Sequence, residues 1–234
     1  NRTVYNQQGI ISSNWSPLTD FKLIDNKSRN TYSVSFLFSQ ILNKNTQFAF
    51  FIDLIKQEGW LANPLQRVYF SDRDNFYIGN PSSISFYTSK LNKDVFHLAD
   101  DIERLPSTRI KVPVGIRFNY FLNENITLRS YYRYYSDDWK INSHTLNLEL
   151  PIKLSDNFTF YPSYRFYSQS KSKYFESYDK HISSSKYYTS DYDLSKFNSN
   201  QLGFGLKYVD IFTKLKVWEI GLKSVDLNYS NYKR

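Results

Sequence analysis

Apolar and polar residues alternate along several long stretches of this chain. The clearest stretch is Arg109–Phe121, in which nearly every second residue is apolar. Successive side chains of a β-strand point to opposite faces, so a period of two predicts a strand with one apolar and one polar face. The apolar set is Ile110, Val112, Val114, Ile116, Phe118 and Tyr120.

A second stretch, Leu128–Tyr135, reads LRSYYRYY and places arginines among tyrosines. Aromatic residues are enriched in strands, and a helix would scatter these side chains around its circumference. We therefore predict a strand in which the two arginines share one face. The same reasoning predicts eight strands: Thr31–Ile41, Thr46–Lys56, Arg109–Phe121, Ile126–Tyr135, Ile141–Leu154, Phe158–Tyr167, Gln201–Val209 and Leu215–Tyr229.

The connections between these strands alternate in length. Three similar segments, ILNKNTQF, FLNENITL and KLSDNFTF, contain Asn and Asp residues that favour tight hairpin turns. The short turns are Leu42–Asn45, Leu122–Asn125, Ser155–Asn157 and Asp210–Lys214, and Ser136–Asn142 is a modest link. Two long loops, residues 57–108 and 168–200, fall on the other side. Short turns on one rim and long loops on the other are typical of bacterial outer-membrane barrels.

Strand length also favours a membrane protein. The predicted strands match or exceed the 9 to 11 residues or so that cross a bilayer at a tilt, whereas soluble strands average about 5 or 6. The predicted fold class is therefore all-β, an antiparallel up-and-down transmembrane β-barrel. A soluble lipocalin-like barrel is the alternative, since it also alternates but buries its apolar face inside.

The positions of the arginines indicate which face of the predicted sheet contacts lipid. An arginine that faces lipid at the bilayer centre costs about 2–4 kcal/mol, so the arginine face is expected to line the lumen. The expected lumen residues are Arg109, Lys111, Arg117, Arg129, Tyr131, Arg133, Tyr135, Arg165 and Lys207. The expected aromatic residues at the membrane interface are Tyr120, Tyr132, Tyr134 and Phe160. Asp53 and Glu149 are the acids expected inside.

The amino-acid composition further limits the classes of protein and of binding partner that fit this chain. The chain has 234 residues, enough for one sizeable domain over residues 1–234, and a net charge of +8. Its Lys and Arg are dispersed, which argues against nucleic acid as a partner. It has no Cys, so no disulfide or thiolate site is possible. No stretch is long and apolar enough for a spanning helix. Because both ends of the eight strands fall on the exterior side, we expect a partial span of a barrel with at least ten strands.

Several phrases resemble a family of Bacteroidota outer-membrane proteins of unknown function. They are LADDIERLPSTRIKVPVGIRFNYF at Leu98–Phe121, LRSYYRYYSDDWKINSHT at Leu128–Thr145, FYPSYRFY at Phe160–Tyr167 and YYTSDYDLS at Tyr187–Ser195. The resemblance implies a surface-directed barrel in the bacterial outer membrane, with further strands before and after this part. It supplies no activity and no catalytic residue.

Three functions remain open on this evidence. The first is a scaffold whose exterior loops dock a surface lipoprotein or a larger envelope complex. The second is a porin-like pore for small anionic solutes, unless arginines and tyrosines fill the narrow interior. The third is a surface hydrolase, which requires loop folding to bring His181 near Asp179, or His97 near Asp100 and Asp101.

Two weaker hypotheses concern the loops. The string SDRDN at Ser71–Asn75 has the spacing of oxygen ligands for calcium, with Asp191 as a further candidate, but it lacks the glycine and distal glutamate of an EF-hand. The DDIER cluster, Asp100–Arg104, is expected to form ion pairs with arginines such as Arg109. We predict no catalytic residue, no metal site and no cofactor, and therefore no enzyme.

Overall fold

The computed structural model describes residues 3–19, 21, 28–213 and 216–234, and these residues form an all-β protein. They divide into two compact units. The first, the sheet unit, comprises Thr31–Gln57, Arg109–Lys173 and Lys196–Arg234. The second, the loop unit, comprises Asn1–Asn30, Glu58–Thr108 and Tyr174–Ser195. The two segments expected to be long loops thus contribute most of a folded unit.

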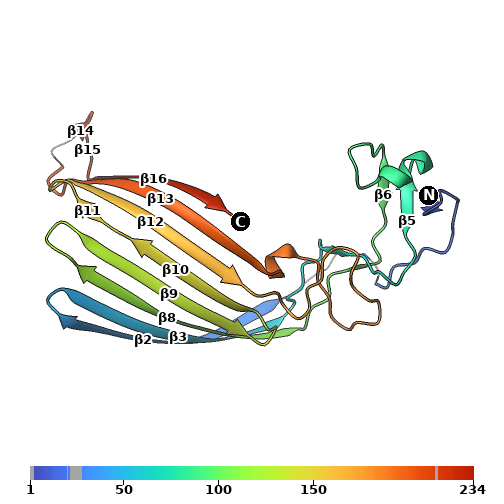
Figure 1. Ribbon diagram of the computed structural model, residues 1–234, viewed down its shortest axis with the longest axis horizontal. Coiled ribbons are helices and arrows are strands. Elements are labelled where there is room, and N and C mark those ends of the chain that lie inside the picture. The colour runs from blue at the N-terminus through green and yellow to red at the C-terminus, as the bar shows by residue number, and fades with distance from the viewer. Residues whose placement is uncertain (1–2, 20, 22–27, 214–215) are drawn as a thin grey trace. The chain divides into compact units, whose positions relative to one another are not determined.

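The sheet unit contains one curved antiparallel sheet (Figure 1). The strand order is β16-β13-β12-β10-β9-β8-β3-β2, so strands that are consecutive along the sheet are joined by hairpins or by the longer segments. Their bounds are β2 Arg29–Asn43, β3 Thr46–Gly59, β8 Thr108–Phe121, β9 Thr127–Asp137, β10 Asn142–Glu149, β12 Phe158–Gln169, β13 Phe197–Val209 and β16 Ser224–Lys233.

The sheet is open among the described residues. Strands β2 and β16 are its two edges, and no described strand pairs with the outer side of either. The sequence prediction of an antiparallel all-β fold is thus confirmed, while closure into a barrel is not seen. All fifteen residues of β2 are exposed, which is the expected consequence of its edge position.

Several predicted strands differ from the structure in their bounds, and two of them differ most clearly. The strand predicted at Ile141–Leu154 is divided into β10 and β11 (Ile152–Lys153) by Pro151, which has no N–H to donate to a ladder. The eighth strand was predicted to start at Leu215, but β16 begins at Ser224. A small hairpin of β14 (Lys216–Val217) and β15 (Ile220–Gly221) precedes it. Lys214 and Leu215 themselves lie outside the described residues.

The register of the ladders gives the sheet two chemically different faces. Arg117, Tyr131, Asn147 and Arg165 are directly opposite one another on β8, β9, β10 and β12. The next positions along the same strands carry apolar side chains that point to the other side. We call these two surfaces the polar face and the apolar face of the sheet.

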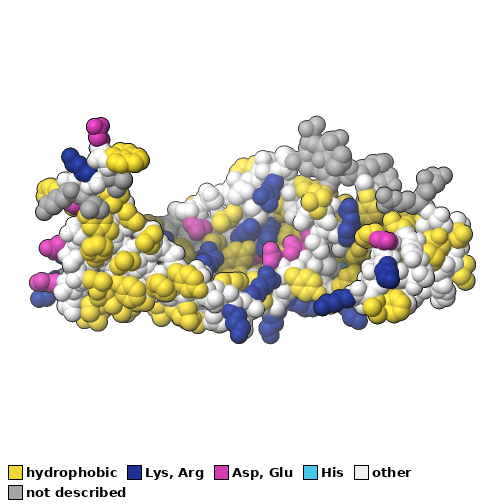
Figure 2. Space-filling view, turned by 90° about the horizontal axis from the view of Figure 1, so that it is seen from above, with side chains coloured by type: hydrophobic (Ala, Val, Ile, Leu, Met, Phe, Trp, Pro, Cys, Tyr) yellow, Lys and Arg dark blue, Asp and Glu magenta, His cyan; other side chains and the backbone are white. Residues whose placement is uncertain are grey.

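The apolar face is exposed rather than packed against other residues. Its large side chains include Tyr32, Val34, Phe36, Phe38, Ile110, Ile116, Leu202, Phe204, Leu227 and Tyr229, all of which are substantially exposed. In Figure 2, hydrophobic side chains gather along the lower left border, over the strands of the sheet. A buried hydrophobic cluster of Val68, Phe70 and Tyr188 lies instead in the loop unit.

The loop unit consists of short ladders and two short 3-10 helices. Strands β1 (Val4–Asn6), β5 (Phe76–Gly79) and β6 (Val95–His97) form a three-stranded sheet, and β4 (Arg67–Val68) pairs with β7 (Asp101–Ile102). The 3-10 helices are η1 (Pro81–Phe86) and η2 (Tyr192–Leu194). Among the described residues, no helix is both long and apolar enough to cross a membrane.

Candidate functional site

The polar face of the sheet collects the basic and aromatic residues expected to line a lumen. A rung is a row of residues that are paired across neighbouring strands. The first rung is Gly115, Arg133, Thr145 and Tyr167, and the second is Arg117, Tyr131, Asn147 and Arg165. The third is Asn119, Arg129 and Glu149. Lys111 lies opposite Asp137, Tyr135 opposite Pro113, and Lys207 opposite Thr159. Arg109 binds Asp137, so all nine residues share this face. Tyr120, Tyr132, Tyr134 and Phe160 occupy the alternate positions, on the apolar face.

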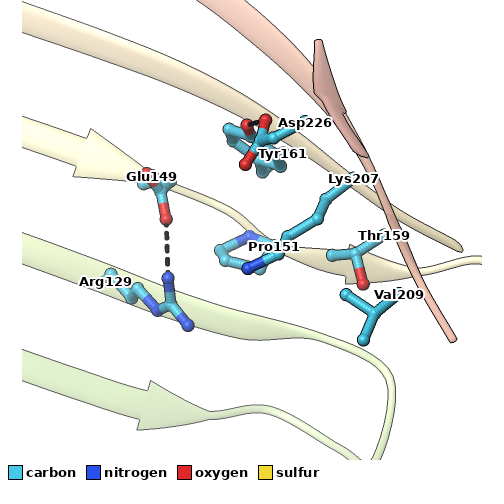
Figure 3. A pocket seen from close by; sticks show the side chains of 8 residues that line it. All are labelled: Arg129, Glu149, Pro151, Thr159, Tyr161, Lys207, Val209 and Asp226. Atoms are coloured by element: carbon cyan, nitrogen blue, oxygen red, sulfur yellow. Dashed lines mark hydrogen bonds and ion pairs between the residues drawn. The ribbon is translucent and has the colours of Figure 1, made fainter. Parts of the chain in front are cut away.

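A pocket of about 370 Å³ lies on the polar face, near the ends of the strands that carry the short turns (Figure 3). Arg129 and Glu149 form an ion pair on one side of it, with 2.9 Å between Nη1 and Oε1. Lys207 and Asp226 are opposite each other on β13 and β16, and the Tyr161 hydroxyl donates to Asp226. Each of the two cations in this pocket is thus matched by a carboxylate.

A second pocket of about 300 Å³ shares Arg129 and Glu149 with the first. Its further lining includes Arg117, Tyr131 and Asn147, from the rung next to Arg129. Neither Arg117 nor Arg165 has a carboxylate opposite it in this rung. Cationic character therefore concentrates in the middle of the polar face, and the charges near the short turns are balanced.

Stacked side chains cover part of this middle region. The rings of Phe51 and Tyr131 stack with centroids 5.7 Å apart, and the Arg117 guanidinium lies 5.7 Å from each centroid. A guanidinium over an aromatic face is stabilised by the ring quadrupole. Thr145, in the neighbouring rung opposite Arg133 and Tyr167, is only 2% exposed although the sheet is open. These side chains thus cover part of the polar face, while Arg117, Arg129 and Arg165 are exposed on it.

Arg109 has a different carboxylate partner from the one expected. Its guanidinium binds Asp137, whose side chain is fully buried, and it lies 4.3 Å from the ring centroid of Trp139. Asp137 also accepts hydrogen bonds from the Tyr135 hydroxyl and the Ile141 amide. The prediction that Arg109 pairs with the DDIER cluster was wrong, because the local β9–β10 turn supplies the nearer carboxylate.

The carboxylates of the DDIER cluster instead bind groups within the loop unit. Asp100 accepts from the Phe70 amide, and Asp101 accepts from the hydroxyls of Thr19 and Tyr188. Arg104 donates to Asp101. These bonds connect segments distant in sequence, so the cluster holds the loop unit together.

Glu103 in the same cluster is 3% exposed, and burial raises its pKa to about 7. Its Oε1 accepts from the Asn63 amide at 3.0 Å and its Oε2 from the Thr189 hydroxyl at 3.1 Å. The nearby charge of Asp191 raises the pKa further. Because the charged form is poorly solvated there, Glu103 titrates near neutral pH.

The three histidines lie in separate environments. His144 is on the apolar face, where its Nδ1 is 2.8 Å from the Tyr132 hydroxyl. His181 is buried, and its Nε2 is 2.9 Å from the Thr189 carbonyl oxygen. His97 is surrounded by tyrosines, and burial lowers its pKa to about 4, so its imidazole is neutral. The arrangement of His97 with Asp100 and Asp101 considered for a hydrolase is replaced by contacts with Tyr87 and Tyr178.

The oxygen ligands considered for calcium are engaged separately. Asp72 accepts from the Ser183 amide and hydroxyl, which lowers the pKa of its carboxyl group, and Asp191 caps η2 by accepting from the Asp193 amide. Within the described ranges, no three His, Cys, Asp or Glu side chains come together as a metal-binding group.

A comparison with known protein families shows to which family the chain belongs. Residues 2–231 match the model of a family described as "Protein of unknown function (DUF3570)". The chain belongs to this family. The match spans both the sheet unit and the loop unit, so the two are parts of one family sequence. No curated protein matches the chain.

Sequence reasoning missed two carboxylates of this DUF3570 member. Asp226 was overlooked because the eighth strand was started too early, although Val225, Leu227 and Tyr229 alternate with it clearly. Asp137 was assigned to a polar link, and its burial by Trp139 and Tyr135 has no signal in local periodicity. Both lie against basic residues of the polar face, so the face is less positive than predicted.

Proposed function

We propose that the sheet unit is the lipid-embedded wall of an antiparallel up-and-down β-barrel in the bacterial outer membrane. The single observation that carries this proposal is the exposed apolar face, which extends from β2 to β16 opposite a face of arginines, tyrosines and amides. A soluble barrel would bury its apolar face inside. In a membrane, lipid covers that face and the charged side chains turn inward.

The two open edges fit this proposal when further strands pair with them. Every backbone N–H and C=O in the hydrocarbon region must find a partner, because lipid offers none. Strands β2 and β16 each present one unpaired side. The proposed barrel therefore closes through strands that pair with both edges, which gives a minimum of about ten strands for an even-numbered antiparallel barrel.

Single-cysteine labelling tests the membrane location directly, since the chain has no native Cys to remove. Leu202→Cys lies on the apolar face, where Leu202 is 65% exposed, and Gln201→Cys is the matched control on the adjacent residue of the same strand. Gln201 lies on the polar face opposite Arg165 and Tyr232. Each variant of the full chain is spin-labelled and reconstituted in liposomes.

We expect lipid-soluble oxygen to relax the spin label at position 202. The label at position 201 should be relaxed by a water-soluble nickel complex, or by neither reagent if the interior excludes both. Equal access of the nickel complex to both labels would contradict a lipid-facing apolar surface. A reversed pattern would indicate a soluble barrel with an apolar interior.

Within this membrane protein, the stacked side chains that cover part of the polar face and its charge-balanced pocket support a structural role more than a pore. We propose that the barrel is a scaffold and that the loop unit docks a surface lipoprotein or a larger envelope complex. The loop unit exposes large apolar side chains on its surface, among them Leu65, Leu91 and Phe96. Large exposed apolar side chains on a folded unit are candidate contact points for a partner.

Substitution of two of these side chains tests the docking role. Leu65→Asp and Leu91→Asp change exposed positions, so the loop unit is expected to stay folded, and the exposed Lys90→Asp is the matched control. With lipoproteins labelled metabolically by a fatty-acid analogue, we expect a labelled lipoprotein to co-purify with the unmodified protein and with Lys90→Asp. Retention of that lipoprotein by both leucine variants would contradict docking at these residues.

The pore for small anions is the second candidate, supported by Arg117, Arg133 and Arg165 in the middle of the polar face. A ring of arginines selects anions if a continuous channel passes it. The stack of Phe51, Tyr131 and Arg117 and the charge-matched pocket near Glu149 count against such a channel.

A further inference from the structure

The apolar face of the sheet changes character along the length of its strands. Near the short turns, the rung of Phe160, Leu206 and Leu227 is entirely apolar. Nearer the opposite end of the sheet, one rung consists of Tyr134, His144, Ser168 and Asn198. A boundary between apolar and polar side chains thus crosses this face of the sheet.

The polar side chains beyond the boundary are oriented by bonds among themselves. The Tyr132 hydroxyl lies 2.8 Å from Nδ1 of His144, and the Tyr134 hydroxyl donates to the Asn142 side-chain oxygen at 3.1 Å. All four side chains are nevertheless exposed. Hydroxyl and amide groups carry more than one donor or acceptor position, so these side chains can bind a further polar ligand. We define the rim band as the exposed residues Tyr132, Tyr134, Asn142, His144, Asn198 and Asn200.

Exposed lysines border the rim band. Lys233 lies opposite Asn200 on the neighbouring strand β16, and Lys196 directly precedes β13. Lys140 belongs to the turn between β9 and β10, and its carbonyl oxygen accepts from the Ser170 hydroxyl. All three lysines are exposed. Positive charge therefore lies beside the rim band at three places, which come from three different segments of the chain.

Carboxylates are scarce around the rim band. The segments that surround it are residues 138–142, 168–173, 196–200 and 231–234. All of these residues are described, and Asp138 is the only acid among them. At the end of the sheet with the short turns, by contrast, the exposed acids Glu124, Asp156 and Glu219 accompany the lysines. The sheet unit is thus positively charged around the rim band and of mixed charge at its other end.

The position of the rim band gains a meaning from the proposed membrane location, on which this inference rests. The short turns of outer-membrane barrels face the periplasm, so the rim band lies on the exterior side of the bilayer. Aromatic residues with a polar tip lie at the level of the lipid headgroups. The apolar rungs then contact acyl chains, and the rim band contacts the headgroups of the outer leaflet.

The chemistry of this surface selects a class of headgroup. Basic residues at a membrane surface attract anionic lipids, and lysine binds phosphate as a point charge. The hydroxyl, imidazole and amide groups of the rim band suit the hydroxyls of a sugar, which also donate and accept hydrogen bonds. We propose that the rim band, with Lys140, Lys196 and Lys233, binds the phosphorylated sugar headgroup of a glycolipid in the outer leaflet.

Native mass spectrometry of the full chain in detergent tests this site. The probes are diphosphoryl lipid A and the same lipid after removal of both phosphates. We expect the unmodified protein to bind diphosphoryl lipid A at least about tenfold more tightly than the dephosphorylated lipid. The triple variant Lys140→Gln, Lys196→Gln and Lys233→Gln should weaken binding of diphosphoryl lipid A by at least about tenfold, because each lysine near a membrane surface adds to the attraction of anionic lipid.

The matched control is the triple variant Lys44→Gln, Lys216→Gln and Lys223→Gln, which removes the same charge from exposed positions at the end with the short turns. It should bind diphosphoryl lipid A as the unmodified protein does, and heat-modifiable mobility should show that both triple variants are folded. Equal binding of the two lipids by the unmodified protein, or binding of neither, would overturn the proposal. Equal losses in the two triple variants would also overturn it, because net charge rather than this surface would then attract the lipid.

The spin label at position 202 separates this proposal from the membrane location. Contact of that label with lipid, together with no preference for the phosphorylated lipid, would overturn the glycolipid site alone. Access of the nickel complex to that label would overturn the membrane location and the glycolipid site together.

Discussion

The guanidinium of Arg109 and the carboxylate of Asp137 are paired across the start of β8 and the end of β9, with 2.9 Å between Nε and Oδ2. The Asp137 side chain is fully buried and that of Arg109 is partly buried, and Asp137 also accepts hydrogen bonds from the Tyr135 hydroxyl and the Ile141 amide. A buried carboxylate with this many partners holds the β9–β10 turn against the neighbouring strand. The pair therefore connects three strands at the end of the sheet opposite the short turns.

Asp137→Asn is expected to destabilise the sheet unit severely. The substitution keeps the shape of the side chain but leaves the Arg109 charge buried without its partner, a change that typically costs about 3–5 kcal/mol. Urea unfolding followed by intrinsic fluorescence measures the loss. Asp138→Asn, at the exposed neighbouring position, is the matched control and should change the free energy of unfolding by less than about 0.5 kcal/mol. Equal effects of the two substitutions would contradict the structural role of the pair.

The raised pKa of Glu103 predicts that the stability of the loop unit depends on pH. Burial raises the pKa of its carboxyl group from 4.5 to about 7, so the neutral form is favoured in the folded state. The stabilisation associated with a raised pKa is complete below the unfolded-state pKa and is lost as the pH rises through the folded-state pKa. The loop unit should therefore become less stable between about pH 5 and pH 8, by on the order of 3 kcal/mol at full ionisation.

Glu103→Gln should remove most of this pH dependence, because glutamine keeps the hydrogen-bonding shape and cannot ionise. Pulse proteolysis in urea, with mass spectrometry to locate cuts in residues 58–108, measures the stability at each pH. Glu124→Gln, at an exposed turn of the sheet unit, is the matched control and should leave the dependence in place. A loop unit with the same stability at acid and alkaline pH would show that Glu103 is not the titrating group.

Periodicity was sufficient to predict the strands of the sheet unit and their two faces. In Arg109–Phe121, every second residue is apolar, and the structure places β8 over almost the same range. The short turns after β2, β8 and β11 were also predictable, because Asn43 and Asn123 cap their own turns through side-chain hydrogen bonds, as Asx turns do. These features depend on residues close in sequence.

The loop unit was not predictable in the same way. Its strands have two to four residues, too short for a period of two to be recognised, and its contacts join segments far apart in sequence. The bond between Thr189 and Glu103 spans 86 residues, and that between His97 and Tyr178 spans 81. The histidines were noticed in the sequence, but their tyrosine partners could be found only from the fold. Long-range contacts of this kind leave no local pattern.

The close surroundings of Gly115 predict that a larger side chain at this position destabilises the sheet unit. A Cβ at this position would lie 2.4 Å from Phe51 Cζ and 2.6 Å from the Tyr132 carbonyl oxygen. Because the latter atom is backbone, Gly115→Ala should force a shift of the strands and cost about 1–3 kcal/mol. Gly203→Ala is the milder comparison, since its nearest atom at 2.8 Å is the movable Ser163 hydroxyl. Urea unfolding of both variants should rank Gly115→Ala as the less stable, and the reverse order would contradict close packing of Phe51.

Conductance separates the scaffold from the pore. The full-length protein, shown to be folded by its heat-modifiable mobility, is reconstituted in a planar bilayer under a salt gradient. We expect no steady current, because the stack of Phe51, Tyr131 and Arg117 and the ion pair of Arg129 with Glu149 project from the polar face into the proposed lumen. A steady anion-selective current would instead favour the pore.

In that case, the double substitution of Arg117 and Arg165 by Glu should shift the reversal potential toward cation selectivity, because both guanidiniums lie in the rung that lacks carboxylates. A current that keeps its selectivity in this double variant would show that ions bypass the polar face.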